Sequence, residues 1–409
     1  MMLTAEQNRL LTEVEGDAPF GQMMRERYWI PCARSAALVA DGAPQHVRLL
    51  GDNYAAFRAT DGRIGFFDEA CPHRGASLVL AQNKDCALRC LYHGWKIDVT
   101  GQVVDVPSEG ARAATFGQNI KVSAYPTFEG GGLLWVYLGK GDPPPRPPLP
   151  FLDLEDDLVW VCRSVSPSNW FQGVEGTIDS VHVGTLHQSW IGGHYKTEDS
   201  KNPSIALTLD SHPRYEVEET PYGMKAAALR DLPDGRQYVR VTNYVMPFVS
   251  LVPAGNTDRE GTMFIAVPRD NHEHMLFWGF WSEQAPRLEG EKDMTVGERN
   301  LDNWVRFDEG PNRTWGQDRE AMARGHFSGF TGCIVDEDLV IQASQGVIQD
   351  RSREHLCSSD VGIGRLRRRL LDEIAAWQNG LLAIDGEIPD KVRPLDTITD
   401  GAKAWRELV

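Results

Sequence analysis

Two short segments of the chain each pair a cysteine with a histidine. The first is Cys71-x-His73, and after sixteen intervening residues the second is Cys90-x2-His93. Two thiolates and two imidazoles can build a tetrahedral zinc site. They can also build a two-iron cluster in which one iron takes both thiolates and the other takes both imidazoles. The four residues therefore predict a metal centre.

The spacing of these ligands separates the two alternatives. Structural zinc sites favour a pair of cysteines and a separate pair of histidines, whereas each segment here contributes one of each. CPHRG at 71–75 and CLYHGW at 90–95 closely resemble the two cluster loops of Rieske proteins. Neither loop carries the extra cysteine pair of the respiratory-chain members, so the resemblance points to the oxygenases. It implies one Rieske 2Fe–2S cluster, with Tyr92 and Trp95 packed around it.

A second candidate metal site lies between Asn169 and His187. Asp179 and His182 are three residues apart, which places them on one face of a helix. His182 and His187 are five apart, about 140° around an ideal helix, so they can share a metal only if the helix bends. Gly184 lies between them and makes a bend cheap. Two histidines still need a carboxylate to complete the facial triad of a non-haem iron site.

The pattern NWxQxxExxxDxxHxxxxH resembles the iron-binding helix of the Rieske non-haem iron oxygenases. The stretch over residues 333–360 resembles the phthalate-dioxygenase-like branch of that family. The resemblance implies a mononuclear Fe(II) bound by His182, His187 and Asp338, the aspartate of a Glu-Asp pair. Asp336 is the alternative ligand if the register is shifted by two residues.

In that family an aspartate connects the two metal sites across a subunit boundary. Mapped onto this chain, His93 of one subunit would hydrogen-bond Asp179 of its neighbour, and Asp179 would also orient His182. Asp179 would then serve electron transfer without binding the metal. Glu175 would either support the ligands or be a polar helix residue that faces a neighbouring element. The resemblance also implies a homotrimer.

A proline-rich connector divides the elements that must position these residues. Residues 139–150, GKGDPPPRPPLP, contain six prolines and cannot form a helix or a central strand. Before the connector, short β-rich runs alternate with Gly and Asp turns, which predicts a small all-β Rieske domain over residues 45–143. Residues 1–44 are expected to form an N-terminal helical arm whose first helix is capped by Thr4.

After the connector, the pattern predicts one catalytic domain over residues 144–409, with an antiparallel sheet and helices. The fold class is therefore α+β, and the resemblance implies a helix-grip architecture for this domain. Strands are expected over residues 222–231, 237–253, 261–269 and 274–281, and helices near 169–187, 295–306 and 364–383.

The composition narrows the class of partner. A net charge of −16 argues against binding nucleic acid and against an anionic membrane surface. The chain opens without a signal-like segment and has no apolar run of about 18 residues, so a cytoplasmic location is expected. Seven scattered cysteines make a poor disulfide framework. The five outside the cluster motif are expected to be buried thiols: Cys32, Cys86, Cys162, Cys333 and Cys357.

Electrons must come from another protein. No G-x-G-x-x-G opens a βαβ unit, and no further cysteine set fits a plant-type cluster. NAD(P)H would therefore act through a separate flavin and iron–sulfur reductase, with or without a ferredoxin. Relatives in this branch act on aromatic acids, so a small carboxylated aromatic substrate is expected. Arginine binds carboxylates in a bidentate manner, and Arg214, Arg230 and Arg240 lie in strands expected to line the pocket.

The reaction favoured at this point is O-demethylation of a methoxylated aromatic acid. The alternatives are ring cis-dihydroxylation of a phthalate- or phenoxybenzoate-like acid, and N-demethylation, which an acidic or aromatic-cage pocket would favour. Two other classes stay open. An electron carrier would leave about 260 residues after the connector without a purpose. A zinc-dependent structural or regulatory protein would be colourless, whereas a Rieske cluster is red-brown.

Overall fold

The computed structural model describes residues 2–194, 207, 212–253, 260–284, 310 and 312–409. Over these residues the chain forms two compact units. The smaller unit comprises Glu15–Asp17 and Gly21–Arg146, and the larger comprises the residues up to Val14, Ala18–Phe20 and Pro147–Val409. The division after Arg146 falls within the proline-rich connector. Residues 1–44, expected as one arm, contribute to both units.

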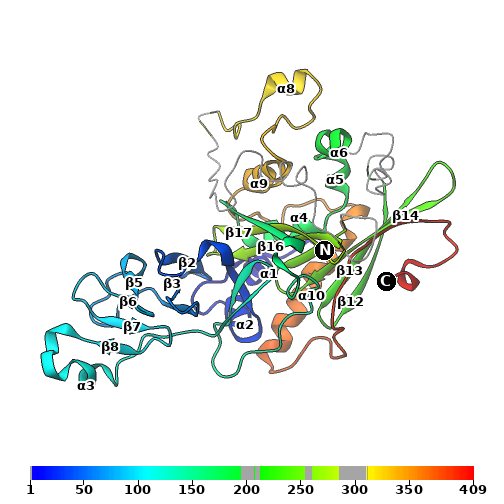
Figure 1. Ribbon diagram of the computed structural model, residues 1–409. Helices are drawn as coiled ribbons and strands as arrows, with labels where there is room; N and C mark the ends of the chain where they lie inside the picture. Colours follow the sequence, from blue (N-terminus) through cyan, green and yellow to red (C-terminus); the bar gives the residue numbers. More distant parts are fainter. Residues whose placement is uncertain (1, 195–206, 208–211, 254–259, 285–309, 311) are drawn as a thin grey trace. The chain divides into compact units, whose positions relative to one another are not determined.

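The smaller unit consists mainly of short antiparallel strands in three sheets (Figure 1). The sheet orders are β1-β10-β9, β2-β3-β4 and β5-β6-β7-β8. Its helical turns are η1 (Ser35–Ala37), η2 (Leu78–Leu80), η3 (Pro107–Arg112) and α3 (Ala113–Gly117). Its strands are β1 (Ile30–Arg34), β2 (Gln45–Leu49), β3 (Asp52–Arg58), β4 (Ile64–Asp68), β5 (Gln82–Lys84), β6 (Ala87–Arg89), β7 (Lys96–Asp98), β8 (Val103–Asp105), β9 (Thr127–Gly130) and β10 (Leu133–Val136).

The loops that carry the cysteine–histidine pairs join β4 to β5 and β6 to β7. Both loops rest on one apolar core, which contains Phe57, Phe67 and Leu88 together with the two loop cysteines, Cys71 and Cys90. Burial of large apolar side chains beneath the loops fixes them with respect to each other. The sheets of this unit therefore act as a platform for the four predicted ligands.

The larger unit is built on an eight-stranded antiparallel sheet of order β11-β17-β16-β15-β14-β13-β12, in which β18 also pairs with β14. Every residue of β17 is buried, as expected for an interior strand that is covered on both faces. The strands are β11 (Val159–Ser166), β12 (Arg214–Thr220), β13 (Gly223–Asp231), β14 (Gln237–Val245), β15 (Val249–Val252), β16 (Glu260–Pro268), β17 (His274–Ser282) and β18 (Leu395–Thr399). The four predicted runs of strand are confirmed.

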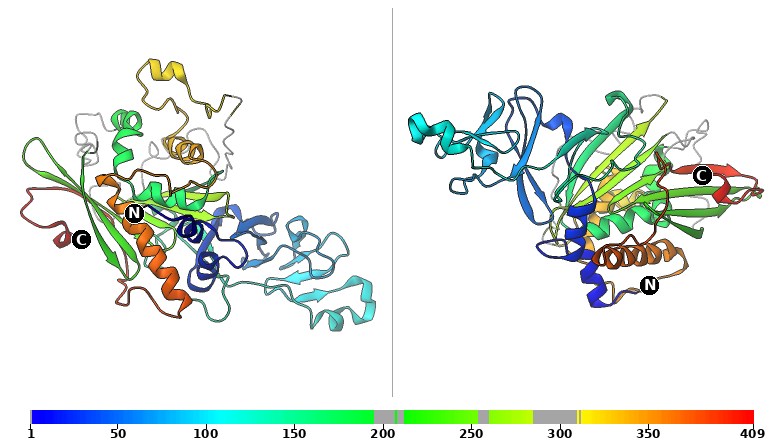
Figure 2. Two further views of the ribbon diagram at one scale, coloured as in Figure 1. Left: turned by 180° about the vertical axis from the view of Figure 1, so that it is seen from behind. Right: turned by 90° about the horizontal axis from the view of Figure 1, so that it is seen from below.

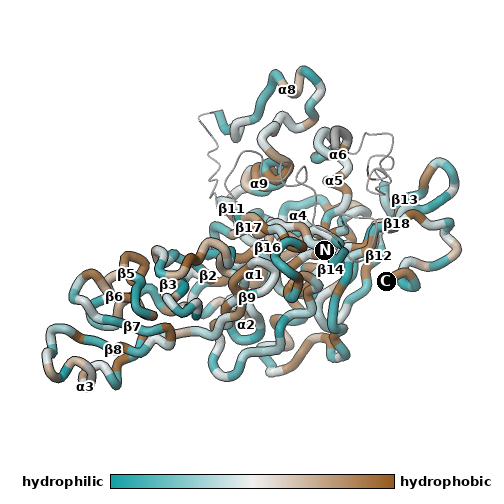
Figure 3. The backbone as a smooth tube through the Cα atoms, in the orientation of Figure 1, coloured by the Kyte–Doolittle hydropathy of each residue, from teal (hydrophilic) through white to brown (hydrophobic). Residues whose placement is uncertain are grey.

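Helices cover this sheet and bring distant parts of the sequence together. α4 packs on β15, β16 and β17 and also contacts α9 and α10, while α10 lies across β12 and β13 (Figure 2). In Figure 3, the tube is largely brown (hydrophobic) at α9, whereas teal (hydrophilic) residues predominate around α8. The helices of this unit are α1 (Ala5–Thr12), α4 (Trp170–Ile178), α5 (Val181–Thr185), α6 (Gln188–His194), α8 (Arg319–Ala323), α9 (Ile334–Ser344) and α10 (Val361–Gln378), while α2 (Pro19–Arg27) lies mostly in the smaller unit. Short helical turns are η4 (Asp156–Leu158), η6 (Ser358–Asp360) and η7 (Trp405–Glu407).

The α+β fold class predicted from the sequence is confirmed. Thr4 caps α1 as expected, because its side chain accepts a hydrogen bond from the backbone N–H of Gln7. The helix expected near 295–306 lies outside the described residues. The prediction of buried thiols was wrong for Cys357, which is exposed, and Cys86 is only partly buried. None of the described helices combines the length and apolar character that a membrane crossing requires.

Candidate functional site

The segment expected to be one bent helix, residues 169–187, is divided into two short helices, α4 and α5, and α6 begins directly after it. Asp179 follows the last residue of α4, where its backbone N–H still donates to the carbonyl oxygen of Glu175. His182 lies in α5, and His187 lies in the turn between α5 and α6. The predicted bend therefore exists, but it lies next to His187 and not at Gly184.

Gly184 has a different reason to be glycine. The carbonyl oxygen of Leu207 occupies the space where a Cβ atom at residue 184 would be placed. The absence of a side chain therefore allows the backbone of Leu207 to approach α5 closely. Sequence reasoning was wrong about the function of this glycine because a close approach leaves no periodic signal.

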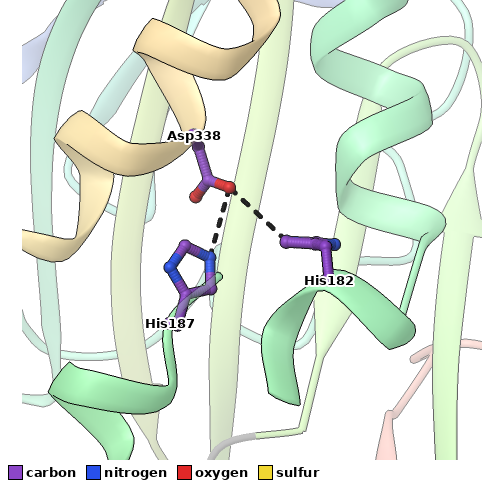
Figure 4. A group of neighbouring side chains, drawn as sticks. All are labelled: His182, His187 and Asp338. Carbon is purple, nitrogen blue, oxygen red and sulfur yellow. Dashed lines mark ion pairs between the residues drawn. The ribbon is translucent and has the colours of Figure 1, made fainter. Parts of the chain in front are cut away.

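Three side chains converge although α9 is far from α5 in the sequence. Oδ1 of Asp338 lies 3.4 Å from Nε2 of His182 and 3.2 Å from Nε2 of His187 (Figure 4). One ligand atom from each residue lies within 4.8 Å of the other two, so the group could hold a metal ion. Two imidazole nitrogens and one carboxylate are the ligand set of a facial triad. The rival, Asp336, is not part of this group.

Each histidine of this group also meets a second carboxylate through its other ring nitrogen. Nδ1 of His182 lies 3.4 Å from Oδ2 of Asp179. Nδ1 of His187 lies 2.6 Å from Oε2 of Glu337, which is fully buried and also accepts a hydrogen bond from Ser328. A carboxylate in this position fixes the tautomer that leaves Nε2 available to a metal. Sequence reasoning missed the role of Glu337, although it noted this residue as the neighbour of Asp338.

The electrostatics of the group favour a bound cation. Burial alone would lower the pKa of His182, but Asp179 and Asp338 outweigh it and raise that pKa to about 10. Burial would also lower the pKa of His187, but Asp338 and Glu337 outweigh it and raise that pKa. Burial would raise the pKa of Asp338, but the two imidazoles outweigh it and lower that pKa. Carboxylates thus surround the imidazoles on several sides, and a divalent cation would neutralise their negative charge.

The two loops of the smaller unit have matching backbone geometry. Gly75 donates its N–H to the carbonyl oxygen of Cys71 over 2.9 Å, and Gly94 donates to Cys90 over the same distance. Both glycines have positive φ, +72° and +75°, which side chains disfavour. This explains why glycine ends both the CPHRG and the CLYHG segments. Each loop therefore folds back on its own cysteine in the same way.

The cysteines and histidines of these loops lie at different depths. Cys71 and Cys90 are buried, and burial together with the neighbouring thiol raises the pKa of Cys71 to about 11. His73 is exposed, and its ring centroid is 4.5 Å from that of His93. Two adjacent thiols inside and two adjacent imidazoles outside suit a cluster with one iron bound by each pair.

Aromatic rings support the two histidines as predicted. Trp95 stacks on His73 with ring centroids 4.6 Å apart and an angle of 6° between the planes. The ring of Tyr92 lies 3.8 Å from that of His93, and its side chain is more than half exposed. The imidazoles are therefore held from the side by aromatic rings, while the surface beyond them stays open.

The His182–His187–Asp338 group opens onto a cavity of about 120 Å³, which we call the substrate cavity. Its apolar wall includes the aromatic rings of Phe264, Trp278 and Phe280, contributed by β16 and β17. Its polar wall includes Arg240 and Gln342. A flat apolar ligand can therefore reach the three converging residues, with polar groups available on one side.

The three predicted arginines lie in different environments. Arg240 lines the substrate cavity and forms a buried ion pair with Asp396 over 3.2 Å. Arg230 is also buried, but it donates to the carbonyl oxygen of Ser180 over 3.0 Å and does not line the cavity. Arg214 is exposed and pairs with a carboxylate on its own strand. Of the three, only Arg240 can meet a ligand in the substrate cavity.

Glu175 belongs to a buried network of charges and does not line the substrate cavity. Its carboxylate accepts hydrogen bonds from Nε of Arg351 over 2.9 Å and from Nε of Arg367 over 2.7 Å. Arg367 also pairs with Glu354. Burial alone would raise the pKa of Glu175, but the two arginines outweigh it and lower that pKa. The network anchors α4 one turn before Asp179.

Comparisons with known families account for most of the chain. Residues 28–126 match the family described as "Rieske [2Fe-2S] domain", and residues 136–409 match the family described as "LigXa C-terminal domain like". These two ranges contain the cysteine–histidine loops and the converging histidines and aspartate, respectively.

Two relatives and one solved structure extend over nearly the same length. The chain is 39% identical to the phthalate 4,5-dioxygenase oxygenase subunit of Pseudomonas putida, over 99% of this chain and 94% of the relative. It is 30% identical to the 5,5'-dehydrodivanillate O-demethylase oxygenase subunit of Sphingobium sp. strain NBRC 103272 / SYK-6, over 97% of this chain and 87% of the relative. The terminal oxygenase of carbazole 1,9a-dioxygenase from Nocardioides aromaticivorans IC177 shares the fold, with a TM-score of 0.59 and a sequence identity of 19%. The match covers 92% of this chain and 98% of that structure.

Proposed function

The chain belongs to the Rieske non-haem iron oxygenases, as an oxygenase component, and on that premise we propose that it cis-dihydroxylates a single-ring aromatic carboxylate. Members of this family are O2-dependent oxidoreductases, and their cofactors are a Rieske 2Fe–2S cluster and a mononuclear iron. The observation that carries the proposal is the opening of the His182–His187–Asp338 group onto an apolar cavity with a buried arginine on its wall.

The residues present suit both cofactors. Cys71 and Cys90 would hold one iron of the cluster, and His73 and His93 would hold the other. The mononuclear iron would be held by His182, His187 and Asp338 through the three ligand atoms that already converge. When bound, the cluster supplies one-electron transfer and the mononuclear iron supplies O2 activation. The protein binds and orients the aromatic ring and excludes water with the apolar walls of the cavity.

We propose that two subunits together complete the path between the cofactors. In a homotrimer, His93 of one subunit would hydrogen-bond Asp179 of its neighbour. The accessible rings of Tyr92 and His73 on the cluster loops support this arrangement. So does the contact of Asp179 with Nδ1 of His182. Asp179 would thereby connect the two sites while binding neither metal.

A separate electron-transfer protein completes the system. Residues 28–126 and 136–409 match the cluster and catalytic families, so neither range is a flavin or NAD(P)H domain. We propose that this partner is a flavin and iron–sulfur reductase, with or without a ferredoxin. Within this chain, we propose that the cluster domain comprises residues 45–143 together with the rest of Gly21–Arg146, and that the catalytic domain comprises Pro147–Val409, so that residues 1–44 are divided between the two.

The size and polarity of the substrate cavity support the choice of substrate. A volume of about 120 Å³ is comparable with cavities of roughly 150 Å³ that bind benzene, which suits one ring better than two. The aromatic walls match the faces of such a ring. Arg240 is the natural partner for a carboxylate. The 39% identity to a phthalate dioxygenase subunit over the full length supports ring oxidation as the reaction.

O-demethylation of a methoxylated aromatic acid is the second candidate. It is favoured by the 30% identity to a dehydrodivanillate O-demethylase subunit, and it was the reaction that the sequence alone favoured. Both reactions need the same iron site and the same bound carboxylate. They differ in whether a ring carbon or a methoxy carbon faces the iron.

A substrate panel tests the proposal. The enzyme, supplied with a generic reductase, is offered phthalate, benzoate, methoxylated benzoates and neutral aromatics, and the products are scored for diol and formaldehyde. We expect diols from phthalate-type acids without formaldehyde. Formaldehyde without diol would replace the proposal by O-demethylation, and oxidation of neutral aromatics alone would refute both.

The panel also includes a matched pair of arginine variants. Arg240→Lys keeps the charge but loses bidentate geometry, so KM for carboxylates should rise by about 10- to 100-fold. Arg214→Lys serves as the control, because this residue is exposed and outside the cavity. Equal KM values for both variants and the wild type would show that Arg240 does not bind the carboxylate of the substrate.

A further inference from the structure

α9 presents one row of side chains to the substrate cavity. Ile334, Asp338 and Gln342 are four residues apart, so they share one face of the helix, and all three line the cavity. Gln342 lies one turn beyond Asp338, about 6 Å along the helix axis. A substituent bound by Gln342 would therefore hold the aromatic ring at a fixed distance from the iron ligands.

The carboxamide of Gln342 is buried without its full set of partners. The residue is 8% exposed, and among the described residues nothing donates a hydrogen bond to its Oε1. Buried polar atoms are nearly always paired, and leaving one unpaired destabilises the protein. Gly176 of α4 makes room for the amide, because a Cβ at that residue would lie 2.8 Å from Nε2 of Gln342.

The unpaired oxygen does not result from a loosely held helix end. Nε2 of Gln172 donates to the backbone carbonyl oxygen of Gln342 over 2.8 Å and ties α9 to α4. Two other polar side chains on the cavity wall already have partners. Thr177 bonds Ser250 over 2.6 Å, and Arg240 pairs with an aspartate. The amide oxygen is thus a positioned acceptor that still lacks a donor.

Trp278 is the other described wall residue with a buried unpaired polar atom, the indole Nε1. An indole N–H can only donate, so it suits a carboxylate or an ether oxygen. The Oε1 atom of Gln342 can only accept, so it requires a substituent that carries a hydrogen. The two atoms therefore call for different groups on the ligand.

Resting on the proposed function, we propose that Gln342 recognises a hydroxyl substituent of the aromatic acid, whose O–H donates to Oε1. The preferred substrates are then hydroxylated aromatic acids, and Gln342 is a specificity-determining residue. An analogue without the hydroxyl leaves the buried acceptor unpaired. Sites built to bind a hydroxyl discriminate strongly against such analogues for this reason.

Equilibrium binding tests this assignment without turnover. Calorimetry on the holoenzyme, with neither reductase nor reductant, compares benzoate with 2-, 3- and 4-hydroxybenzoate. We expect at least one hydroxylated isomer to bind about 10- to 100-fold more tightly than benzoate. In Gln342→Met, which keeps the shape but cannot accept, that ratio should fall to about one while the affinity for benzoate stays nearly unchanged.

Two further variants complete the test. Gln342→Glu keeps acceptor oxygens, so it should retain the preference for the hydroxyl even if all carboxylates bind more weakly. Gln345→Met is the control, because Gln345 is exposed and does not line the substrate cavity. Its affinities should match those of the wild type.

Protein stability separates a binding role from a structural one. Removing an unpaired buried acceptor should leave the thermal midpoint of ligand-free Gln342→Met equal to that of the wild type or higher. A lower midpoint, with the hydroxyl preference intact, would overturn the assignment and make Gln342 structural. If the benzoates bind without a hydroxyl preference, the assignment also fails. If no benzoate binds at all, the assignment fails as well, and the proposed function fails with it only if phthalate is not oxidised in the substrate panel.

Discussion

Each histidine of the proposed iron site uses its two ring nitrogens for different partners. Nε2 faces Asp338, while Nδ1 faces Asp179 in the case of His182 and Glu337 in the case of His187. The two supporting carboxylates differ in their surroundings. Glu337 is fully buried, whereas the side chain of Asp179 is 31% exposed. Glu337 therefore suits a fixed supporting role, and Asp179 is open enough to meet a partner.

Replacing Glu337 by Gln tests this supporting role. Glutamine keeps the shape but weakens the hydrogen bond that holds Nδ1 of His187, so the affinity for iron should fall by about 10- to 100-fold. The measurement is iron retention during titration with a chelator. Glu320→Gln on α8 is the control, because its side chain is 90% exposed, and its iron affinity should not change. Equal retention by both variants would contradict the role of Glu337.

At the scale of elements, the site depends on how α4 and α9 are anchored. Asn169 begins α4 by accepting a hydrogen bond from the N–H of Phe171, and the charges around Glu175 hold its last turn. Arg351 is fully buried, so it meets this carboxylate away from water. Removing one partner of a buried ion pair strongly destabilises a protein, because the other charge is left buried and unpaired.

Arg351→Met should therefore lower the free energy of unfolding by about 3–5 kcal/mol, because Glu175 would keep only one of its two arginines. Arg368→Met is the matched control on α10. Arg368 pairs with Asp372 at the surface, with its side chain 62% exposed, so a loss of about 0–1 kcal/mol is expected. Denaturant unfolding measures both values. A loss in Arg351→Met no greater than in the control would show that the network does not anchor α4.

The elements differ in how far the sequence could predict them. Strands β14 to β17 were predictable because their runs of β-branched and aromatic residues are buried in one sheet. The break at Asp179 was not predictable, because no proline marks it. The spacing of His182 and His187 did predict a bend between them, but not its place next to His187. Asp338 could be assigned only by resemblance, since nothing local distinguishes it from Asp336. Packing of α9 against α4 brings it to the histidines.

At the scale of the whole molecule, the two units divide the chemistry. The smaller unit carries the cysteine–histidine loops, and the larger carries the two histidines and Asp338 with the substrate cavity. The spacing of the four cysteines and histidines was enough to predict a Rieske domain, because all four lie on two loops within 23 residues of sequence, 71–93. Fold class and family followed from these motifs. The unpaired oxygen of Gln342 left no trace in the sequence, because it arises from the packing of two helices.

Iron analysis combined with electron paramagnetic resonance tests the central claim, two different iron sites in one chain. Anaerobically purified protein should contain about three iron atoms per chain, and its reduced form should show the signal of a Rieske cluster. His187→Ala should lose about one iron while keeping that signal. Protein without a Rieske signal, or His187→Ala with unchanged iron content and full activity, would contradict the account.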